Sequence, residues 1–233
     1  MTKKSYGKHT SANNKRSNMA GNHLKAIDIE PLTQTQDVAL QCTNNMISCG
    51  VAGTGKTFIS LHKAFKLVEE NSAEYKKVVI IRSTVPTRDI GFLPGDEHEK
   101  ASVYEEPYRE LCTNIFNRGD AYDLMKNKGL VEFRSTSFLR GLTMDSCAVV
   151  VDECQNMTLH ELDTVITRVG IDCRIFFCGD FQQSDLGDSG FNPFMRILKE
   201  MKQFDIVEYT VDDIVRSEFV KTYIVAKLTL GIK

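Results

Sequence analysis

The sequence predicts an α/β fold in which a predominantly parallel β-sheet carries helices on both faces. From about residue 33, short apolar runs that fit β-strands alternate with longer segments of helical periodicity. The runs are those of buried hydrophobic strands, and their alternation with helices indicates a parallel sheet that is covered on both faces. Hydrophobic residues make up 42% of the 233 residues, which is enough to fill one sizeable core and excludes disorder of the whole chain.

The strands and the first two helices follow from these patterns. The strands are expected near residues 46–50, 78–82, 130–134, 147–151, 174–178 and 205–209. A first helix follows Lys56, and one of its faces carries the apolar residues Phe58, Leu61, Phe65 and Val68. A second helix opens with a capping box from Thr158 to Glu161, and its inward face is Leu162, Val165, Ile166 and Val169.

Two further helices are expected nearer the C-terminus. Asn192-Pro193 starts one of them, whose apolar stripe is Phe194, Ile197, Leu198 and Met201. Asp212 or Asp213 starts the other, which is expected to continue through Ile214, Phe219 and Ile224.

Residues 1–27 are expected to form a disordered basic tail, because they contain several Lys and Arg residues and no Asp or Glu. This tail is either a solubilising terminus or an arm that adds phosphate contacts to a nucleic-acid site. Residues 28–233 are expected to form one domain. The whole chain has 29 Lys+Arg against 31 Asp+Glu, so its net charge is −2 and any nucleic-acid binding would depend on local clusters of cations.

The sequence has neither a run of 18 apolar residues nor an apolar leader, so no membrane-spanning segment is expected. Its seven cysteines include no CxxC pair, and most lie in apolar stretches, where a thiol behaves as a small hydrophobe. We therefore expect a cytoplasmic protein with buried free thiols and no membrane partner.

The segment from Gly50 to Thr57 fits the GxxxxGK[ST] pattern of phosphate-binding loops. It lies after a predicted strand and before a predicted helix, which is where such a loop has to be. Its glycines allow backbone N–H groups to face phosphate oxygens, and the helix N-terminus adds partial positive charge. Lys56 would reach the β- and γ-phosphates, and the hydroxyl of Thr57 would hold Mg²⁺. The sequence therefore predicts a nucleotide site.

Two later strands end in polar residues that would lie at the same edge of the sheet. The run Val149–Val151 ends in Asp152, expected to hold Mg²⁺, and Glu153, expected to polarise the attacking water. The run that ends in Gly179-Asp180 is followed by Gln183, which either senses the γ-phosphate or belongs to a solvated loop.

Several motifs together resemble the PhoH-like family of ATPases, whose core is similar to the first domain of superfamily-one helicases. They are Gly91–Asp96, Asp152–Asn156, Gly179–Leu186 and Ile214–Ser217, and the likeness runs from about residue 30 to the C-terminus. Gln36, which precedes the phosphate loop, matches the family's adenine-reading glutamine. Phe181-Gln182 and Cys154 depart from the family's Pro-Ser and Ala, and Leu142 interrupts its Arg-Gly-Arg-Thr pattern.

The resemblance implies a single RecA-like P-loop NTPase domain that hydrolyses ATP with Mg²⁺. It also implies a ring of identical subunits, a homohexamer, associated with RNA or single-stranded nucleic acid. Family members occur in bacteria and many bacteriophages and are connected with phosphate starvation. The expected ATP-binding residues are Gln36 and the run Gly50, Val51, Ala52, Gly53, Thr54, Gly55, Lys56, Thr57 and Phe58.

Alternative functions stay open at this point. One is a nucleotide-responsive RNA-binding ring that hydrolyses ATP slowly or not at all. Another is a small-molecule or nucleoside kinase, which Glu153 disfavours because a water-activating glutamate would waste ATP. A GTPase is disfavoured because Asn127-Lys128-Gly-Leu lacks the aspartate of the guanine-reading motif.

Other residues are candidates for nucleic-acid contact and for charge stabilisation. Arg82-Ser83-Thr84 leaves a strand beside the phosphate loop, and Phe92 and Phe138 are either stacking faces or core residues. A chain with a single phosphate loop and a single core leaves the outer face of the γ-phosphate open. The transition state needs positive charge there, so a further arginine is expected. Arg216 is the candidate, and it would act on a neighbouring subunit's ATP or on its own; an ordinary surface arginine is the alternative.

Overall fold

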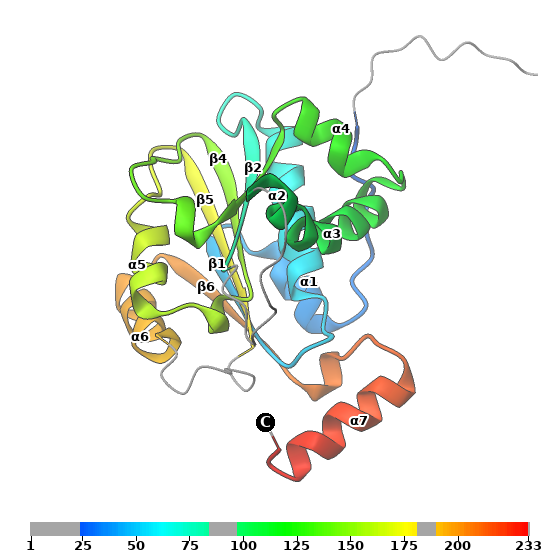
Figure 1. The fold of residues 1–233 in the computed structure, drawn as a ribbon. Helices are drawn as coiled ribbons and strands as arrows, with labels where there is room; N and C mark the ends of the chain where they lie inside the picture. The colour runs from blue at the N-terminus through cyan, green and yellow to red at the C-terminus, as the bar shows by residue number, and fades with distance from the viewer. Residues whose placement is uncertain (1–23, 84–96, 181–189, 233) are drawn as a thin grey trace, which may run out of the picture.

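A computed structural model describes residues 24–83, 97–180 and 190–232 of the chain. Its centre is a six-stranded sheet with the order β3-β2-β4-β5-β1-β6, in which all neighbouring strands are parallel (Figure 1). The six predicted strands are confirmed: β1 (Asn45–Gly50), β2 (Lys77–Arg82), β3 (Val131–Ser135), β4 (Cys147–Asp152), β5 (Cys173–Gly179) and β6 (Phe204–Tyr209). Most of the expected tail, residues 1–23, lies outside the described residues.

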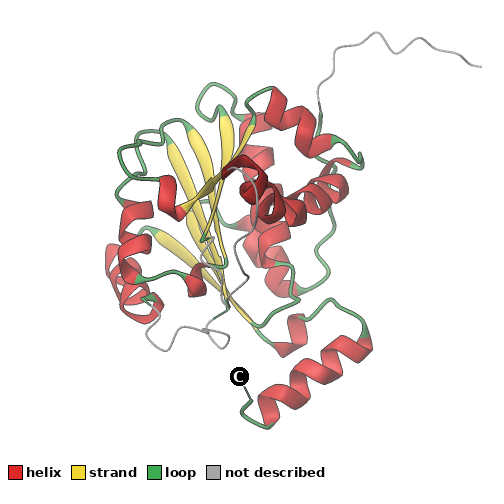
Figure 2. Ribbon diagram, in the orientation of Figure 1, coloured by secondary structure: helices red, strands yellow, loops and turns green. Residues whose placement is uncertain are grey.

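Helices cover both faces of this sheet, as Figure 2 shows by secondary structure. One face carries α1 (Gln34–Gln41), α2 (Lys56–Glu70), α3 (Glu97–Phe116) and α4 (Ala121–Asn127). The other face carries α5 (Leu159–Ile166) and α6 (Phe191–Met201), while α7 (Glu218–Thr229) extends away from the sheet. None of the described helices is long and apolar enough to cross a lipid bilayer.

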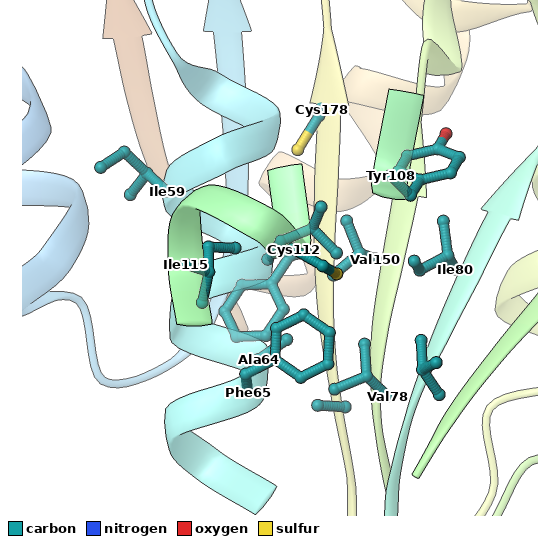
Figure 3. Close-up of a cluster of buried hydrophobic side chains, with 14 of the residues drawn as sticks. Ile59, Ala64, Phe65, Val78, Ile80, Tyr108, Cys112, Ile115, Val150 and Cys178 are labelled. Carbon is teal, nitrogen blue, oxygen red and sulfur yellow. The ribbon is translucent and has the colours of Figure 1, made fainter. Parts of the chain in front are cut away.

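Alternate residues of each strand fill two separate cores, because successive side chains of a strand point to opposite faces. Val78 and Ile80 of β2 pack with Phe65 of α2 and Ile115 of α3 on one side (Figure 3). Their neighbours Val79 and Ile81 pack with α5 and α6 on the other side. This two-sided burial explains why the four inner strands are largely apolar runs, whereas the edge strands β3 and β6 also contain charged residues.

The capping box at the start of α5 is confirmed. The side chain of Thr158 accepts a hydrogen bond from the backbone N–H of Glu161, and the carboxylate of Glu161 accepts one from the N–H of Thr158. The helix after Lys56 is also confirmed. Near the C-terminus, however, α6 begins at Phe191 after Gly190, and not at Asn192-Pro193.

The predicted stripe of α6 is partly wrong. Phe194 and Leu198 are buried, but Ile197 is 49% and Met201 39% exposed. The face toward the sheet is completed by Phe191 and Met195, which lie at the helical spacing of Phe194 and Leu198.

The predicted start of the last helix is also wrong. Asp212 and Asp213 belong to a short 3₁₀ turn, Val211–Asp213, and α7 begins only after Ser217, whose side chain caps it. Between the two, Ile214 is buried and extended, so its burial interrupts the helix.

Candidate active site

The predicted site residues that the structure describes meet at the edge of the sheet where β1, β4 and β5 end. Gly50 ends β1, Asp152 ends β4 and Gly179 ends β5. Ligands of open parallel sheets bind at this carboxyl edge, next to the point where the strand order reverses. In the order β5-β1-β6, the strand that feeds the phosphate loop lies between two strands that come much later in the sequence.

The phosphate loop needs its glycines for backbone reasons. Gly50, Gly53 and Gly55 have φ values of 129°, 79° and 83°, which side chains rarely tolerate. A Cβ on Gly50 would also lie 2.0 Å from the carbonyl oxygen of Tyr209 in β6. The loop runs directly into α2, which begins at Lys56, so the positive end of a 15-residue helix points at the loop.

Lys56 folds back into the loop that precedes it. Its Nζ donates to the carbonyl oxygens of Gly50 and Val51, at 2.8 and 2.7 Å, and only 9% of the residue is exposed. Burial lowers the pKa of Lys56, and the negative charge of Asp180 opposes that shift. A cation that is desolvated in this way gains by exchanging carbonyl oxygens for phosphate oxygens, which carry full charge.

The carboxylate of Asp152 joins the loop helix to the sheet. Thr57 Oγ1 donates to Asp152 Oδ1 at 2.7 Å, and Tyr108 OH donates to Asp152 Oδ2 at 2.9 Å. Burial raises the pKa of Asp152, the charge of Glu153 adds to that shift, and the two hydrogen bonds and Arg82 oppose it. A hydroxyl and a carboxylate side by side are oxygen ligands of the kind that Mg²⁺ takes beside a nucleotide, so this donor set fits the ion.

Glu153 follows in an unusual backbone conformation, with φ 52° in the left-handed region. Gln155 Nε2 donates to Glu153 Oε2 at 2.6 Å, while Gln155 Oε1 accepts from the backbone N–H of Asp180 at 3.0 Å. One glutamine therefore holds the carboxylate that follows β4 and the backbone that follows β5. A Cβ on Gly179 would lie 2.6 Å from Cys154 Sγ and 3.0 Å from Gln155 Oε1, which explains the glycine.

Gln36 lies on α1 and reaches the loop from the other side. Its Nε2 donates to the carbonyl oxygen of Thr54 at 2.9 Å, and its Oε1 accepts from the N–H of Leu32. A Cβ on Gly55 would lie 3.0 Å from the same Nε2. The structure thus brings Gln36 to the loop, as expected for a nucleotide-binding residue, and the amide also supports the loop.

Arg216 lies against the phosphate loop of its own chain. The N–H of Val215 donates to the carbonyl oxygen of Gly53 at 3.0 Å, and a Cβ on Gly53 would lie 2.9 Å from Arg216 Cγ. The residue as a whole is exposed, so the guanidinium is not held in a core. Gln183, the other residue expected beside the γ-phosphate, lies outside the described residues.

The remaining predicted loop residues differ in their surroundings. Val51 and Thr54 are buried, whereas Ala52 is half-buried. Phe58 is also half-buried, and its side chain packs against the core on the α2 face of the sheet.

The residues that are candidates for nucleic-acid contact differ in their surroundings. Phe138 is 55% exposed, so the core alternative is wrong for this residue. Arg82 interacts with Tyr108 and Asp152, which places it beside the candidate metal site. Ser83 donates to Glu161. Thr84 and Phe92 lie outside the described residues.

Sequence reasoning missed one residue of this site, Tyr108, and the positioning role of another, Gln155. Tyr108 lies on α3, a helix whose periodicity is too weak to predict, and it is separated from Asp152 by 44 positions. Gln155 stands in a recognisable motif, but its two hydrogen bonds depend on how close the ends of β4 and β5 lie in the fold.

Comparison with known proteins relates the chain to one protein family. The family model described as PhoH-like protein matches residues 28–227. A PhoH-like protein of Bacillus subtilis (strain 168) is 30% identical over 207 residues, which are 87% of this chain and 64% of the relative. Protein PhoH of Escherichia coli (strain K12) is 30% identical over 184 residues, which are 77% of this chain and 51% of the relative. The chain therefore spans less than two thirds of the length of these relatives.

Solved structures of low sequence identity share the fold. The large terminase of a thermophilic bacteriophage has a TM-score of 0.52 and 11% identity, covering 83% of this chain and 50% of the terminase. Another crystal form of that terminase, in complex with ADP, has a TM-score of 0.51 and 12% identity, covering 83% of this chain and 49% of the terminase. The RecA-like P-loop fold is thereby confirmed. Since the matching family model covers most of the sequence, the chain belongs to the PhoH-like protein family.

Proposed function

We propose that this chain is a Mg²⁺-dependent ATPase. The observation that carries the proposal is the 2.7 Å hydrogen bond between Thr57 and Asp152, residues 95 positions apart. It joins the phosphate loop to the acidic end of β4, and Glu153 would therefore lie beside the terminal phosphate of a bound ATP. A phosphate loop beside a metal-binding aspartate and a second acid has the parts that phosphoryl transfer to water requires.

Each residue then has a defined task. The loop amides and Lys56 would hold the β- and γ-phosphates, and Lys56 would exchange its bonds to Gly50 and Val51 for bonds to phosphate. Thr57 and Asp152 would hold Mg²⁺, which supplies positive charge to the phosphate oxygens. Glu153, oriented by Gln155, would accept the proton of the attacking water as a general base. Gln183 would sense the γ-phosphate.

Arg216 would supply the additional positive charge at the γ-phosphate. The closeness of its side chain to Gly53 supports action on the ATP of its own chain. This choice between own and neighbouring subunit was open from the sequence, and the 3.0 Å bond from Val215 to Gly53 is what favours the own chain.

The same proposal includes self-association through α7. None of the α7 residues is buried, although Phe219 and Tyr223 are large apolar side chains, 83% and 64% exposed. A helix that is apolar on several sides is normally covered by protein. A second copy can cover it, because α6 carries an apolar groove of about 660 Å³ around Ile197 and Met201.

Figure 1 shows α6 and α7 at different flanks of the molecule. A contact between unlike surfaces of successive copies is heterologous and closes into a ring when the rotation permits. This arrangement supports the proposed ring, for which the resemblance suggests six subunits.

Coupling to RNA or single-stranded nucleic acid is the last part of the proposal. The exposed ring of Phe138 supports it, since bases stack on exposed aromatic side chains. The competing function is an RNA-binding ring with little hydrolysis. Glu153 favours the ATPase, because a purely binding module has no use for a base held beside the phosphates.

Phosphate release by the full chain, with and without Mg²⁺ and single-stranded RNA, tests the proposal. Hydrolysis should require Mg²⁺ and should disappear in Lys56→Ala, which should also bind ATP weakly. Lys63→Ala is the matched control, since Lys63 lies on the same helix and bonds to the carbonyl oxygens of Leu40 and Cys42. RNA affinity should fall steeply with salt, as counterion release requires. Tight ATP binding with no hydrolysis in any condition would favour the competing function.

A further inference from the structure

Two cysteine side chains meet at the edge of the sheet opposite the candidate active site. Cys147 begins β4 and Cys173 begins β5, and the two residues are direct partners in the parallel register. Their Sγ atoms lie 3.5 Å apart. Neighbouring strands are spaced by about 4.8 Å, which is within the range of Cα separations that a disulfide accepts. Because the two residues are register partners, their side chains lie on the same face of the sheet.

The two thiols differ in their access to solvent. Cys147 is completely buried, whereas Cys173 is half-buried. Cys173 lines a cleft of about 450 Å³ together with Asn45, Arg174 and Lys202. A small polar oxidant can therefore reach Cys173 from the cleft, whereas Cys147 does not line the cleft.

The surroundings activate the exposed member of the pair. The sulfurs of Cys147 and Cys173 share a hydrogen bond, and this bond lowers the pKa of Cys173. The same interaction, with burial, raises the pKa of Cys147. The attacking species in thiol oxidation is the thiolate, so the more accessible sulfur is also the more reactive one.

We propose that Cys147 and Cys173 form an oxidisable dithiol that a hydroperoxide converts to an intramolecular disulfide. The Cys173 thiolate attacks the O–O bond of hydrogen peroxide, which yields a sulfenic acid on Cys173 and hydroxide, neutralised to water. The Cys147 sulfur then attacks the sulfenic sulfur, its proton leaves with the hydroxyl group as a second water, and the S–S bond forms. Two electrons pass from the sulfurs to the peroxide.

The other cysteines lack this combination of features. Four of them are buried: Cys49, Cys112, Cys154 and Cys178. Cys42 is half-buried, like Cys173. Each of these two thiols also bonds to a backbone carbonyl, Cys42 to that of Val38 and Cys173 to that of Met144. Cys42 is therefore the matched control, because it shares the exposure and the backbone bond of Cys173 without the contact to Cys147.

Peroxide titration of the folded full chain, followed by alkylation and peptide mapping without reductant, tests the site. Wild-type protein should lose two of its seven thiols and yield one cross-linked peptide pair that joins Cys147 and Cys173, reversed by dithiothreitol. Cys42→Ser should behave identically. Cys147→Ser should instead accumulate a sulfenic acid on Cys173 that dimedone traps, and Cys173→Ser should leave Cys147 unmodified.

The wild-type protein alone can test the proposal if a variant fails to fold. A native peptide map in which Cys42 oxidises before Cys173, or in which no link joins Cys147 to Cys173, would overturn the proposal. The same titration in urea should abolish the preference for this pair, because the register that aligns the sulfurs is lost. An equal yield of the link in folded and unfolded protein would also overturn it.

Discussion

At the scale of single residues, the site depends on a hydrogen bond that local sequence does not reveal. Tyr108 is fully buried, and its hydroxyl donates to the carboxylate that is expected to hold Mg²⁺. The bond favours the charged form of Asp152 and fixes its orientation toward Thr57. Tyr108 is thus a positioning residue for the candidate metal site.

Replacing Tyr108 by phenylalanine should leave Asp152 without one of its two donors. The free energy of unfolding should fall by roughly 1–3 kcal/mol, the usual cost of an unpaired buried acceptor. The affinity for Mg²⁺-ATP should fall as well, which a titration with a fluorescent nucleotide measures.

The matched control is Tyr122→Phe, because Tyr122 is also buried and donates to Glu105 at 2.9 Å. That variant should lose comparable stability and keep its nucleotide affinity. Equal nucleotide affinity in both variants would remove Tyr108 from the site.

His62 makes the stability of the fold depend on pH. Its Nε2 bonds to the carbonyl oxygen of Ile27 at 2.8 Å, and burial lowers its pKa, which that bond only partly opposes. The folded chain therefore keeps His62 neutral at a pH where the unfolded chain already binds a proton. Stability is complete above the unfolded pKa of about 6.5 and is lost as the pH falls below it.

Urea unfolding between pH 7.5 and 5 checks this expectation. The free energy of unfolding should fall with pH by about 1.4 kcal/mol for each unit by which the pKa of His62 is lowered. His62→Gln, which keeps an N–H donor for Ile27 but cannot titrate, should show a flatter dependence. Parallel curves for the two proteins would show that His62 does not cause the slope.

The position of Arg216 makes a prediction about subunit exchange. Arg216→Ala should bind ATP nearly normally and hydrolyse it about 10³–10⁵-fold more slowly, the scale of an arginine that acts on the transferred phosphate. Because the side chain lies on its own Gly53, mixing Arg216→Ala with Glu153→Gln subunits should restore no activity. Activity that recovers when the two inactive variants exchange subunits would assign Arg216 to a neighbouring site.

At the scale of secondary-structure elements, prediction succeeded where one local pattern decides the outcome. The inner strands are largely apolar runs, and α5 is fixed by the capping box at Thr158, so both were predictable. The helices α1, α3 and α4 were not predicted. For α3, the sequence Glu97–Phe116 is rich in acids and contains Pro107, and the buried residues in its described part, from residue 103 onward, are Glu105, Tyr108, Cys112 and Ile115.

The late start of α7 has a different cause. Its sequence favours a helix from Asp212 onward, but Ile214 is buried and the next N–H bonds to the phosphate loop. These are long-range contacts, and they overrule the local preference. The same distinction between local and long-range contacts applies to the site. The phosphate loop and Asp152-Glu153 are contiguous motifs and could be predicted. Tyr108 and the hydrogen bonds of Gln155 depend on contacts that form only in the fold.

The apolar surface of α7 leads to a prediction about assembly. Replacing Phe219 and Tyr223 together by serine should reduce the oligomeric mass, because these exposed side chains would lose their burial against a second copy. Ile197→Ser on α6 should have the same effect from the other partner surface. Sedimentation or native mass spectrometry measures the state, and Thr222→Ser, an exposed change on the same helix, is the control. An unchanged mass in both variants would contradict association through α6 and α7.

At the scale of the whole molecule, one edge of the sheet gathers residues from widely separated parts of the chain. Thr57, directly after the phosphate loop, bonds to Asp152 at the end of β4, and Gly53 of the loop accepts a bond from Val215 in the Arg216 segment that follows β6. Gln36 of α1 and Tyr108 of α3 support them from the helical layer. This convergence is what the parallel order of the strands provides, and it is the basis for the claim that the chain hydrolyses ATP.

The most direct measurement compares ATP binding and steady-state phosphate release in wild-type protein and Glu153→Gln. The substitution keeps the shape of the side chain and removes the general base, so ATP should bind normally while hydrolysis slows by about 10²–10⁴-fold. Asp163→Asn, which removes an exposed acid from α5, should match the wild type in both assays. Hydrolysis by Glu153→Gln at the wild-type rate, with ATP bound equally well, would contradict the proposed mechanism.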